Sequence, residues 1–341
     1  MRSKLTRRTF IQSSVAGASS VTSSGFASGE PAVNSSKTAA MPPRRKQTAN
    51  TVRIATIQCN RVPDCDNAKT DPFSDDFNRK ELSLSIEKRI AWYEQLIDQA
   101  GKEKCSLAVI TEDFTRLSPC MTYLDDRSIF QSAVEKQTSM IPERIGKATQ
   151  KNSLFVVACY FALEGDRIFN VADLFDSQGQ LVGRYRKVHL PQYEKWQVSS
   201  GNDFPAFETE LGWIGMLICY DQMWPESAAC CAMNGAQIIC QPSAAILKDY
   251  HMRTRAMDNQ VHHVSSTHRN SLIVSPRADV LANAQDQDPA VVWADVDIDG
   301  STMSDEFFYE SLYSGILDHK ERHLKFRRPS TYRVLTEETP P

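Results

Sequence analysis

Apolar residues recur along the chain with two periods, and each period predicts one kind of element. Val52–Gln58 alternates and is rich in β-branched residues, which is typical of a strand. Residues 81–100 repeat apolar side chains every three or four positions, which predicts a helix with one buried face. Further apolar runs predict strands at 105–110, 154–161, 170–176, 181–187, 213–219, 236–241, 264–267, 271–274, 279–281 and 291–297.

Three more helices are predicted. Two cover residues 139–151 and 249–263, and the third begins at Pro225, which suits a first helical turn, and ends at Gly235. Strands alternate with helices at first and later follow one another. This order indicates an α/β fold with a mixed sheet, or two sheets, covered by helices. Residues 51–300 contain no internal repeat and no linker, so we expect one domain there.

The charges are divided unevenly along the chain. Residues 1–50 hold eight of the 39 Lys and Arg and one of the 42 Asp and Glu, a net charge of +7. The remaining residues therefore carry 31 bases and 41 acids, a net charge of −10. Because affinity for nucleic acid depends on basic side chains that neutralise phosphates, we expect no nucleic-acid partner for this acidic body.

The first residues predict an export signal. Thr6-Arg7-Arg8-Thr9-Phe10 matches the pattern of twin-arginine signals, and a weakly apolar run follows it. This run contains no apolar stretch of 18 residues, which argues against a membrane anchor. We expect a twin-arginine signal over 1–29, a flexible leader over 30–50 and a periplasmic or otherwise extracytoplasmic location. The alternative is a disordered basic tail.

The C-terminal segment, 301–341, is charged and carries a cluster of aromatic residues. We expect this segment to pack on a partner subunit or on a neighbouring surface. The aromatic cluster comprises Phe307, Phe308, Tyr309 and Tyr313.

The nine cysteines have no regular spacing, and their number is odd. This pattern does not predict a disulfide framework, and several cysteines lie in apolar runs as small core residues. There is no Cys-x-x-Cys pair, and we expect no metal.

One cysteine stands at a place that suits a nucleophile. Cys219 ends a predicted buried strand and is followed by a turn and a helix that begins at Pro225. We expect the turn to expose this thiol and the helix dipole to favour the thiolate. An isolated cysteine of this kind is more often a core residue, so the assignment depends on other segments.

Two other strand ends carry groups that complete a constellation. Glu112 follows a predicted buried strand, and we expect desolvation to raise its pKa and to suit it to proton transfer. Lys187 ends an apolar strand, where a buried cation needs a carboxylate partner. The alternatives for Lys187 are a structural ion pair or a cation aimed at a developing oxyanion.

Glu112, Lys187 and Cys219, in this chain order and at strand ends, resemble the nitrilase or carbon–nitrogen hydrolase superfamily. The resemblance covers nearly all of 51–299. Gln58 in the opening strand resembles the start of that family. The remaining matching motifs are Phe169-Asn170-Val171, Gly183-Arg-Tyr-Arg-Lys187-Val-His-Leu190, Cys219-Tyr-Asp-Gln-Met-Trp-Pro-Glu226, Gly235-Ala236, Arg255-Ala-Met-Asp-Asn259 and Ser271-Leu-Ile-Val-Ser-Pro276.

The resemblance implies a role for each of these residues. Glu112 would be the general base, Lys187 the oxyanion stabiliser and Cys219 the nucleophile. Glu194 lies in Tyr193-Glu-Lys-Trp196, which resembles the segment that supplies a second glutamate in amidase branches. We expect Glu194 to position groups or to act as a second acid or base, the alternative being a surface-loop glutamate.

Two neighbours of Cys219 also receive roles. We expect Asp221 to support the nucleophile turn and the backbone N–H of Tyr220 to join Lys187 at the oxyanion. The fold implied by the resemblance is a four-layer α-β-β-α sandwich of two mixed sheets. It also implies a homodimer or larger assembly, and no metal or organic cofactor.

The sequence departs from the family pattern at three places. Thr111 stands where the family often has Pro, Asp258 replaces a usual Glu, and the loop between Lys187 and Glu194 is short. Cys219 is followed by Tyr-Asp and not by Trp-Glu, which argues against a nitrilase that acts on a C≡N bond. The segments around Cys219 and Glu194 resemble most closely those of amidases and N-carbamoyl amidohydrolases.

We therefore predict hydrolysis of a non-peptide C–N bond in a small amide or ureido substrate through a Cys219 thioester. An acyltransferase that uses the same thioester is one alternative. A catalytically silent binding or scaffold protein on the same fold is the other. The sequence does not specify the length or the charge of the substrate.

Overall fold

The computed structural model describes residues 51–245, 247–298 and 327–337 of the protein. The predicted export signal over 1–29 and the predicted leader over 30–50 lie outside these residues. The same is true of most of the C-terminal segment, 301–341, including its aromatic cluster. Within the tail, the described part forms two short 3₁₀ turns, η3 (Pro329–Thr331) and η4 (Arg333–Thr336).

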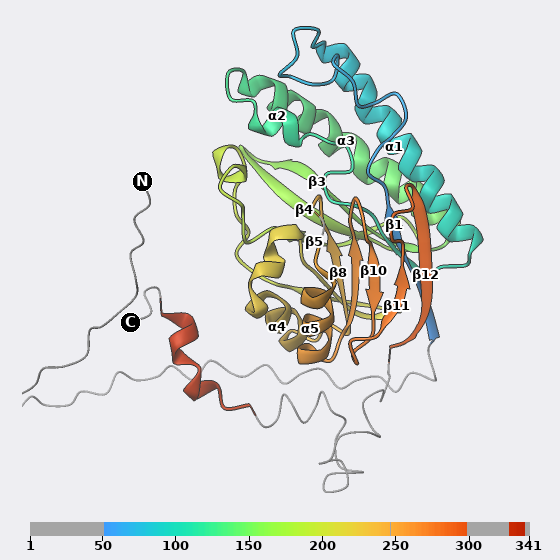
Figure 1. Cartoon of the computed structure of the whole chain (residues 1–341), viewed down its shortest axis with the longest axis vertical. Helices are drawn as coiled ribbons and strands as arrows, with labels where there is room; N and C mark the ends of the chain where they lie inside the picture. Colours follow the sequence, from blue (N-terminus) through green and yellow to red (C-terminus); the bar gives the residue numbers. More distant parts are fainter. Residues whose placement is uncertain (1–50, 246, 299–326, 338–341) are drawn as a thin grey trace, which may run out of the picture. The chain divides into compact units, whose positions relative to one another are not determined.

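The strands form two mixed sheets of six strands each (Figure 1). The first sheet has the order β12-β1-β2-β3-β4-β5 and the second β11-β10-β9-β8-β7-β6. The strands of the first sheet are β1 Thr51–Gln58, β2 Leu107–Val109, β3 Phe155–Glu164, β4 Arg167–Phe175, β5 Leu181–Arg186 and β12 Ala290–Asp297. The strands of the second are β6 Ala206–Thr209, β7 Gly212–Met216, β8 Ile238–Pro242, β9 His262–Ser266, β10 Leu272–Val274 and β11 Val280–Asn283.

Each sheet has three parallel strands at its centre and antiparallel strands on both sides. The parallel strands are β1, β2 and β3 in one sheet and β7, β8 and β9 in the other. In the first sheet, β3 pairs antiparallel with β4, and β4 pairs antiparallel with β5. Two antiparallel steps restore the direction, so β5 ends at the same edge as the parallel strands.

Helices cover the outer face of each sheet (Figure 1). The helices are α1 Arg79–Lys102, α2 Ser118–Thr122, α3 Arg127–Asn152, α4 Pro225–Met233 and α5 Asp249–Asn259. α1 and α3 pack on the first sheet, and α4 and α5 on the second. The result is the predicted four-layer α-β-β-α sandwich.

The alternation of side chains along a strand divides the core. In β1, Ala55 and Ile57 pack towards α1 and α3, whereas Val52 and Ile54 pack against the second sheet. Because successive strand residues face opposite sides, one strand serves both interfaces. The strands of the inner layers are apolar on both faces for this reason.

Two predicted helices have other bounds in the structure. α3 begins at Arg127, twelve residues before the predicted start at 139, because Asp126 caps it by accepting a hydrogen bond from Ser128 N. The helix predicted over 249–263 ends at Asn259, and Gln260 follows with a left-handed φ of 53°. The next residues form strand β9, where β-branched Val264 and its neighbours continue the second sheet.

Two short elements had no strong signal in the sequence. α2 is five residues long, and β6 is four residues long with no fully buried side chain. Within the described part of the chain, no helix is long and apolar enough to cross a membrane.

Candidate active site

Four strand ends converge at one place, two from each sheet. Glu112 follows β2, Lys187 directly follows β5, Cys219 follows β7, and Ala244 follows β8. The carboxyl ends of parallel strands in α/β sheets are the usual position of functional side chains. The site therefore depends on the packing of one sheet against the other.

Lys187 lies between two carboxylates. Its Nζ is 2.9 Å from Oε1 of Glu112 and 2.7 Å from Oε1 of Glu194. All three side chains are buried, with exposed fractions of 0%, 2% and 4%. Glu194 begins the 3₁₀ turn η1 (Glu194–Trp196) and is thus not the surface-loop glutamate of the alternative interpretation.

Glu112 accepts more hydrogen bonds than Glu194. Its Oε1 also accepts a hydrogen bond from Asn170 Nδ2 (2.8 Å), and its Oε2 accepts one from Ala244 N (2.6 Å). Burial acts to raise the pKa of Glu112, but Lys187 and these two donors outweigh burial and lower it. The prediction of a raised pKa at Glu112 is therefore wrong, because burial does not act alone.

Glu194 carries the opposite shift. Burial and the negative charge of Glu112 raise its pKa to about 7, although Lys187 opposes both. Within the described residues, Oε2 of Glu194 is buried and has no hydrogen-bond partner. A carboxyl group that titrates near neutral pH is thus paired with one that remains ionised.

Cys219 sits in a strained turn. It opens the 3₁₀ turn η2 (Cys219–Met223) with a left-handed φ of 43°, which is uncommon for a residue other than glycine. Gln241 Nε2 donates a hydrogen bond to its carbonyl oxygen at 3.1 Å. Strain of this kind persists only where the surrounding structure holds the residue in place.

The turn does not expose the thiol or favour the thiolate. Cys219 is only 9% exposed, and burial together with the charge of Glu112 raises the pKa of its thiol to about 12. Lys187 and Ser243 act against this shift without reversing it. The prediction of an exposed, dipole-stabilised thiolate is therefore wrong. The resting pair is a thiol beside a carboxylate.

Asp221 ties the nucleophile turn to the end of β5. Its Oδ2 accepts hydrogen bonds from Ile218 N (2.9 Å) and Tyr185 Oη (2.7 Å). Its Oδ1 accepts from His189 N at 3.0 Å and lies 2.9 Å from His189 Nδ1. The side chain of Tyr220 is partly exposed and meets the Trp224 ring edge to face.

Three contributors to the site had no role assigned from the sequence. Asn170 lies in β4 and is buried. A polar amide in an apolar strand indicates a hydrogen-bonding role, and this is the signal by which it could have been found. Ala244 acts through its backbone N–H, which no side-chain pattern can indicate. His189 lies in a matching motif, but its contact with Asp221 depends on the three-dimensional fold.

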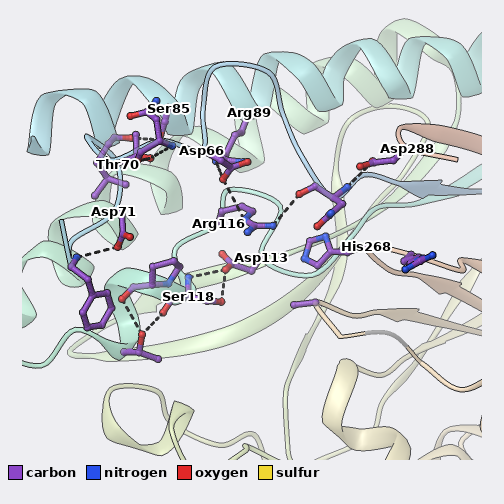
Figure 2. A pocket seen from close by; sticks show the side chains of 18 of the residues that line it. Asp66, Thr70, Asp71, Ser85, Arg89, Asp113, Arg116, Ser118, His268 and Asp288 are labelled. Atoms are coloured by element: carbon purple, nitrogen blue, oxygen red, sulfur yellow. Dashed lines mark hydrogen bonds and ion pairs between the residues drawn. The ribbon is translucent and has the colours of Figure 1, made fainter. Parts of the chain in front are cut away.

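A cavity of about 1170 Å³ is lined by residues that adjoin or contact Glu112, although Glu112 itself is not among its lining residues (Figure 2). Asp113, which follows Glu112, and Ala244, whose N–H binds Glu112, both line it. In Figure 2, Asp113 bonds to Ser118, and Asp66 faces Arg89 and Arg116. Most of the residues that line it are polar, and more of them are acidic than basic.

All nine cysteines lie in the part of the chain that the structure describes, and each is a free thiol. Burial raises the pKa of several others as well, for example that of Cys120 to about 12. Cys219 is therefore distinguished by its strained turn and its charged neighbours. Among the described residues, no three His, Cys, Asp or Glu side chains cluster closely enough to hold a metal ion.

The family model of the carbon–nitrogen hydrolases matches residues 53–302 of this chain. The chain therefore belongs to the carbon–nitrogen hydrolase family. This confirms the resemblance drawn from the motifs.

The chain is also similar to individual proteins of this kind. The chain is 29% identical over 228 residues to the "Nitrilase" of Pyrococcus abyssi, a match that covers 63% of this chain and 86% of that protein. It is 25% identical over 252 residues to the N-carbamoylputrescine amidase of Arabidopsis thaliana, covering 64% and 84%. The solved carbon-nitrogen hydrolase from Helicobacter pylori G27 has the same fold, with a TM-score of 0.66, 20% identity and coverage of 84% and 99%.

Proposed function

We propose that this hydrolase cleaves a small amide or N-carbamoyl substrate through a thioester on Cys219. The observation that supports the proposal most is Lys187, buried between Glu112 and Glu194 at the strand ends where Cys219 also lies. A buried thiol, an ionised carboxylate and an ammonium group together supply a nucleophile, a base and an oxyanion partner.

The first half of the proposed reaction forms the thioester. The sulfur of Cys219 attacks the carbonyl carbon while its proton passes to Glu112, because the raised pKa of the thiol disfavours a free thiolate. Lys187 Nζ, which donates to Glu112 at 2.9 Å, stabilises the developing oxyanion. We propose that the backbone N–H of Tyr220 is a second donor. The C–N bond breaks as Glu112 returns the proton to the leaving amine or ammonia.

The second half hydrolyses the thioester. Glu112 takes a proton from water, the resulting hydroxyl attacks the thioester carbon, and the C–S bond breaks. The proton then returns to the sulfur of Cys219, so the enzyme ends as it began. We propose that Glu194, whose pKa is raised to about 7, keeps Lys187 and the substrate carbonyl in place.

The direct test is Cys219→Ala, with Cys230→Ala as the matched control. Cys230 is a half-buried thiol on α4, away from the strand ends. We expect Cys219→Ala to lose at least about 10³-fold in kcat, since the covalent route is gone, and Cys230→Ala to keep the wild-type kcat. Retained turnover by folded Cys219→Ala would contradict the proposal.

A panel of purified substrates separates the amide from the carbamoyl type. The panel comprises aliphatic amides, N-carbamoyl amines including N-carbamoylputrescine, and N-carbamoyl amino acids. Because most residues that line the cavity with Asp113 and Ala244 are polar, and more of them are acidic than basic, we propose that substrates with a polar or cationic remote group have the highest kcat/KM. A preference for purely apolar amides would contradict this part of the proposal.

Two measurements address the other function classes. A haloacetamide should alkylate Cys219 faster than the other eight thiols, because it presents an amide to the site, whereas a silent scaffold would show no such preference. Product analysis with and without an added amine separates water from amine as the acceptor, and thus a hydrolase from an acyltransferase.

A further inference from the structure

The carboxylate of Asp221 is completely buried and meets four donors. These are the backbone N–H groups of Ile218 and His189, the hydroxyl of Tyr185 and the Nδ1 of His189, at 2.7 to 3.0 Å. An ionised carboxylate has about four acceptor sites, so this set of donors occupies all of them. The carboxylate therefore has no acceptor site left for a further donor.

These donors come from the two segments that carry the proposed chemistry. Ile218 immediately precedes Cys219, whereas Tyr185 and His189 lie two residues before and two residues after Lys187. Tyr185 Oη also accepts the backbone N–H of Val188 at 3.2 Å, so its own proton is directed to Asp221. One carboxylate thus joins the end of β5 in the first sheet to the nucleophile turn in the second.

The ring of His189 is itself packed against two aromatic rings. The Trp224 ring stacks on it with centroids 3.9 Å apart and planes 9° apart, and Phe204 lies on it at 6.0 Å and 28°. Because a carboxylate only accepts, Nδ1 carries the proton in this contact. The only other side chain at Nδ1 among the described residues is Ser227, whose Oγ is 3.5 Å away.

We propose that His189 is a positioning residue, which acts through Asp221 to hold Cys219 and Lys187 in register for attack on the substrate. The inference rests on the proposed function and adds a group that touches neither the substrate nor the reacting atoms. It explains how Cys219 keeps its left-handed φ of 43°, a conformation that is unfavourable in a residue with a side chain.

Two substitutions separate the hydrogen bond from the ring. His189→Asn keeps an N–H donor near the place of Nδ1 and loses the stacked ring, whereas His189→Phe keeps the ring and loses the donor. Misplacement of reacting groups by about 1 Å can cost about 10²-fold in rate. We therefore expect His189→Phe to lower kcat about 10- to 100-fold with KM within about twofold, and His189→Asn to recover most of that loss.

The rate of Cys219 alkylation by a haloacetamide is the readout that a merely structural role would not move. We expect this alkylation rate to fall in His189→Phe in parallel with kcat. Both rates are compared per folded molecule, and a thermal unfolding experiment first confirms that the variant is folded. Wild-type kcat and alkylation in folded His189→Phe would overturn the inference. Equal losses in both variants would overturn it too, because the N–H donor that Asn supplies would then recover no activity.

Tyr185→Phe provides a second variant if His189→Phe does not fold. It removes the other side-chain donor to Asp221, and we expect lower kcat at unchanged KM, while an unchanged kcat would overturn the inference. The Cys219→Ala measurement separates this test from the proposed function. An active Cys219→Ala refutes the thioester, whereas an inactive Cys219→Ala with a fully active His189→Phe refutes only the role of His189.

Discussion

At the scale of single residues, the central feature is one ammonium group shared by two carboxylates. Glu112 receives Lys187, Asn170 and a backbone N–H, whereas one oxygen of Glu194 has no partner among the described residues. Two nearby carboxylates in a buried site disfavour double ionisation, so the better satisfied one keeps the charge. This is the arrangement in which one group acts as a base and the other stays protonated.

Glu194→Gln tests this division through stability. The folded-state pKa of about 7 lies above the ordinary value of 4.5, so the folded protein binds this proton more tightly than the unfolded chain. The resulting stability is fully present below about pH 4.5 and is lost as the pH rises through 7. The free energy of unfolding of the wild type should thus fall relative to Glu194→Gln over this range, by up to about 3 kcal/mol.

Glu112→Gln is the matched comparison, measured by urea unfolding at the same pH values. The pKa of Glu112 is lowered, so its contribution is present above its ordinary value of 4.5 and is lost only as the pH falls further. Glu112→Gln also removes a charge that raises the pKa of Glu194, so we expect the unfolding free energy of this variant to depend less on pH between 4.5 and 7 than that of the wild type. A constant difference between wild type and Glu194→Gln over this range would contradict the raised pKa of Glu194.

At the scale of elements, the site requires β5 of one sheet to approach β6 of the other closely. Gly183 lies on β5, and a Cβ added there would meet Cε1 of Phe207, on β6, at 2.1 Å. Phe207 and Val182, the residue before Gly183, both pack on the apolar layer between the sheets. Glycine is therefore needed at position 183 because the Phe207 ring leaves no space for a side chain, and not because of an unusual backbone angle.

Gly183→Ala should destabilise the protein by about 1–3 kcal/mol, because the new methyl group displaces the ring or the strand. The measurement is urea unfolding of Gly183→Ala, Phe207→Ala and the double variant. Removal of the ring makes room for the methyl group, so the loss in the double variant should be smaller than the sum of the single losses. Additive losses would show that the two residues do not meet.

The elements themselves differ in how well the sequence predicts them. β1 and α1 have strong periods and lie where expected, since a buried face imposes its repeat on the sequence. The start of α3 at Arg127 was missed because the cap at Asp126 precedes the periodic part. The first two residues of β9, His262 and His263, were assigned to the preceding helix, because residues that are buried on both faces have no period that favours either structure.

At the scale of the whole molecule, the two sheets build the site together. Glu112 and Lys187 come from one sheet and Cys219 from the other, and Asp221 joins the two. The family resemblance brought these residues to notice from the sequence. The pKa values of Glu112 and Cys219 were predicted with the wrong sign, because each depends on neighbours that only the three-dimensional packing brings close.

The thioester on Cys219 is the central claim, and it can be observed directly. The measurement is mass spectrometry of the enzyme quenched in acid within the first turnovers of the best amide or N-carbamoyl substrate. The account predicts a mass increase equal to the acyl or carbamoyl group, located on the peptide that contains Cys219 and absent from Cys219→Ala. Turnover with no added mass on Cys219, together with full activity of Cys219→Ala, would contradict it.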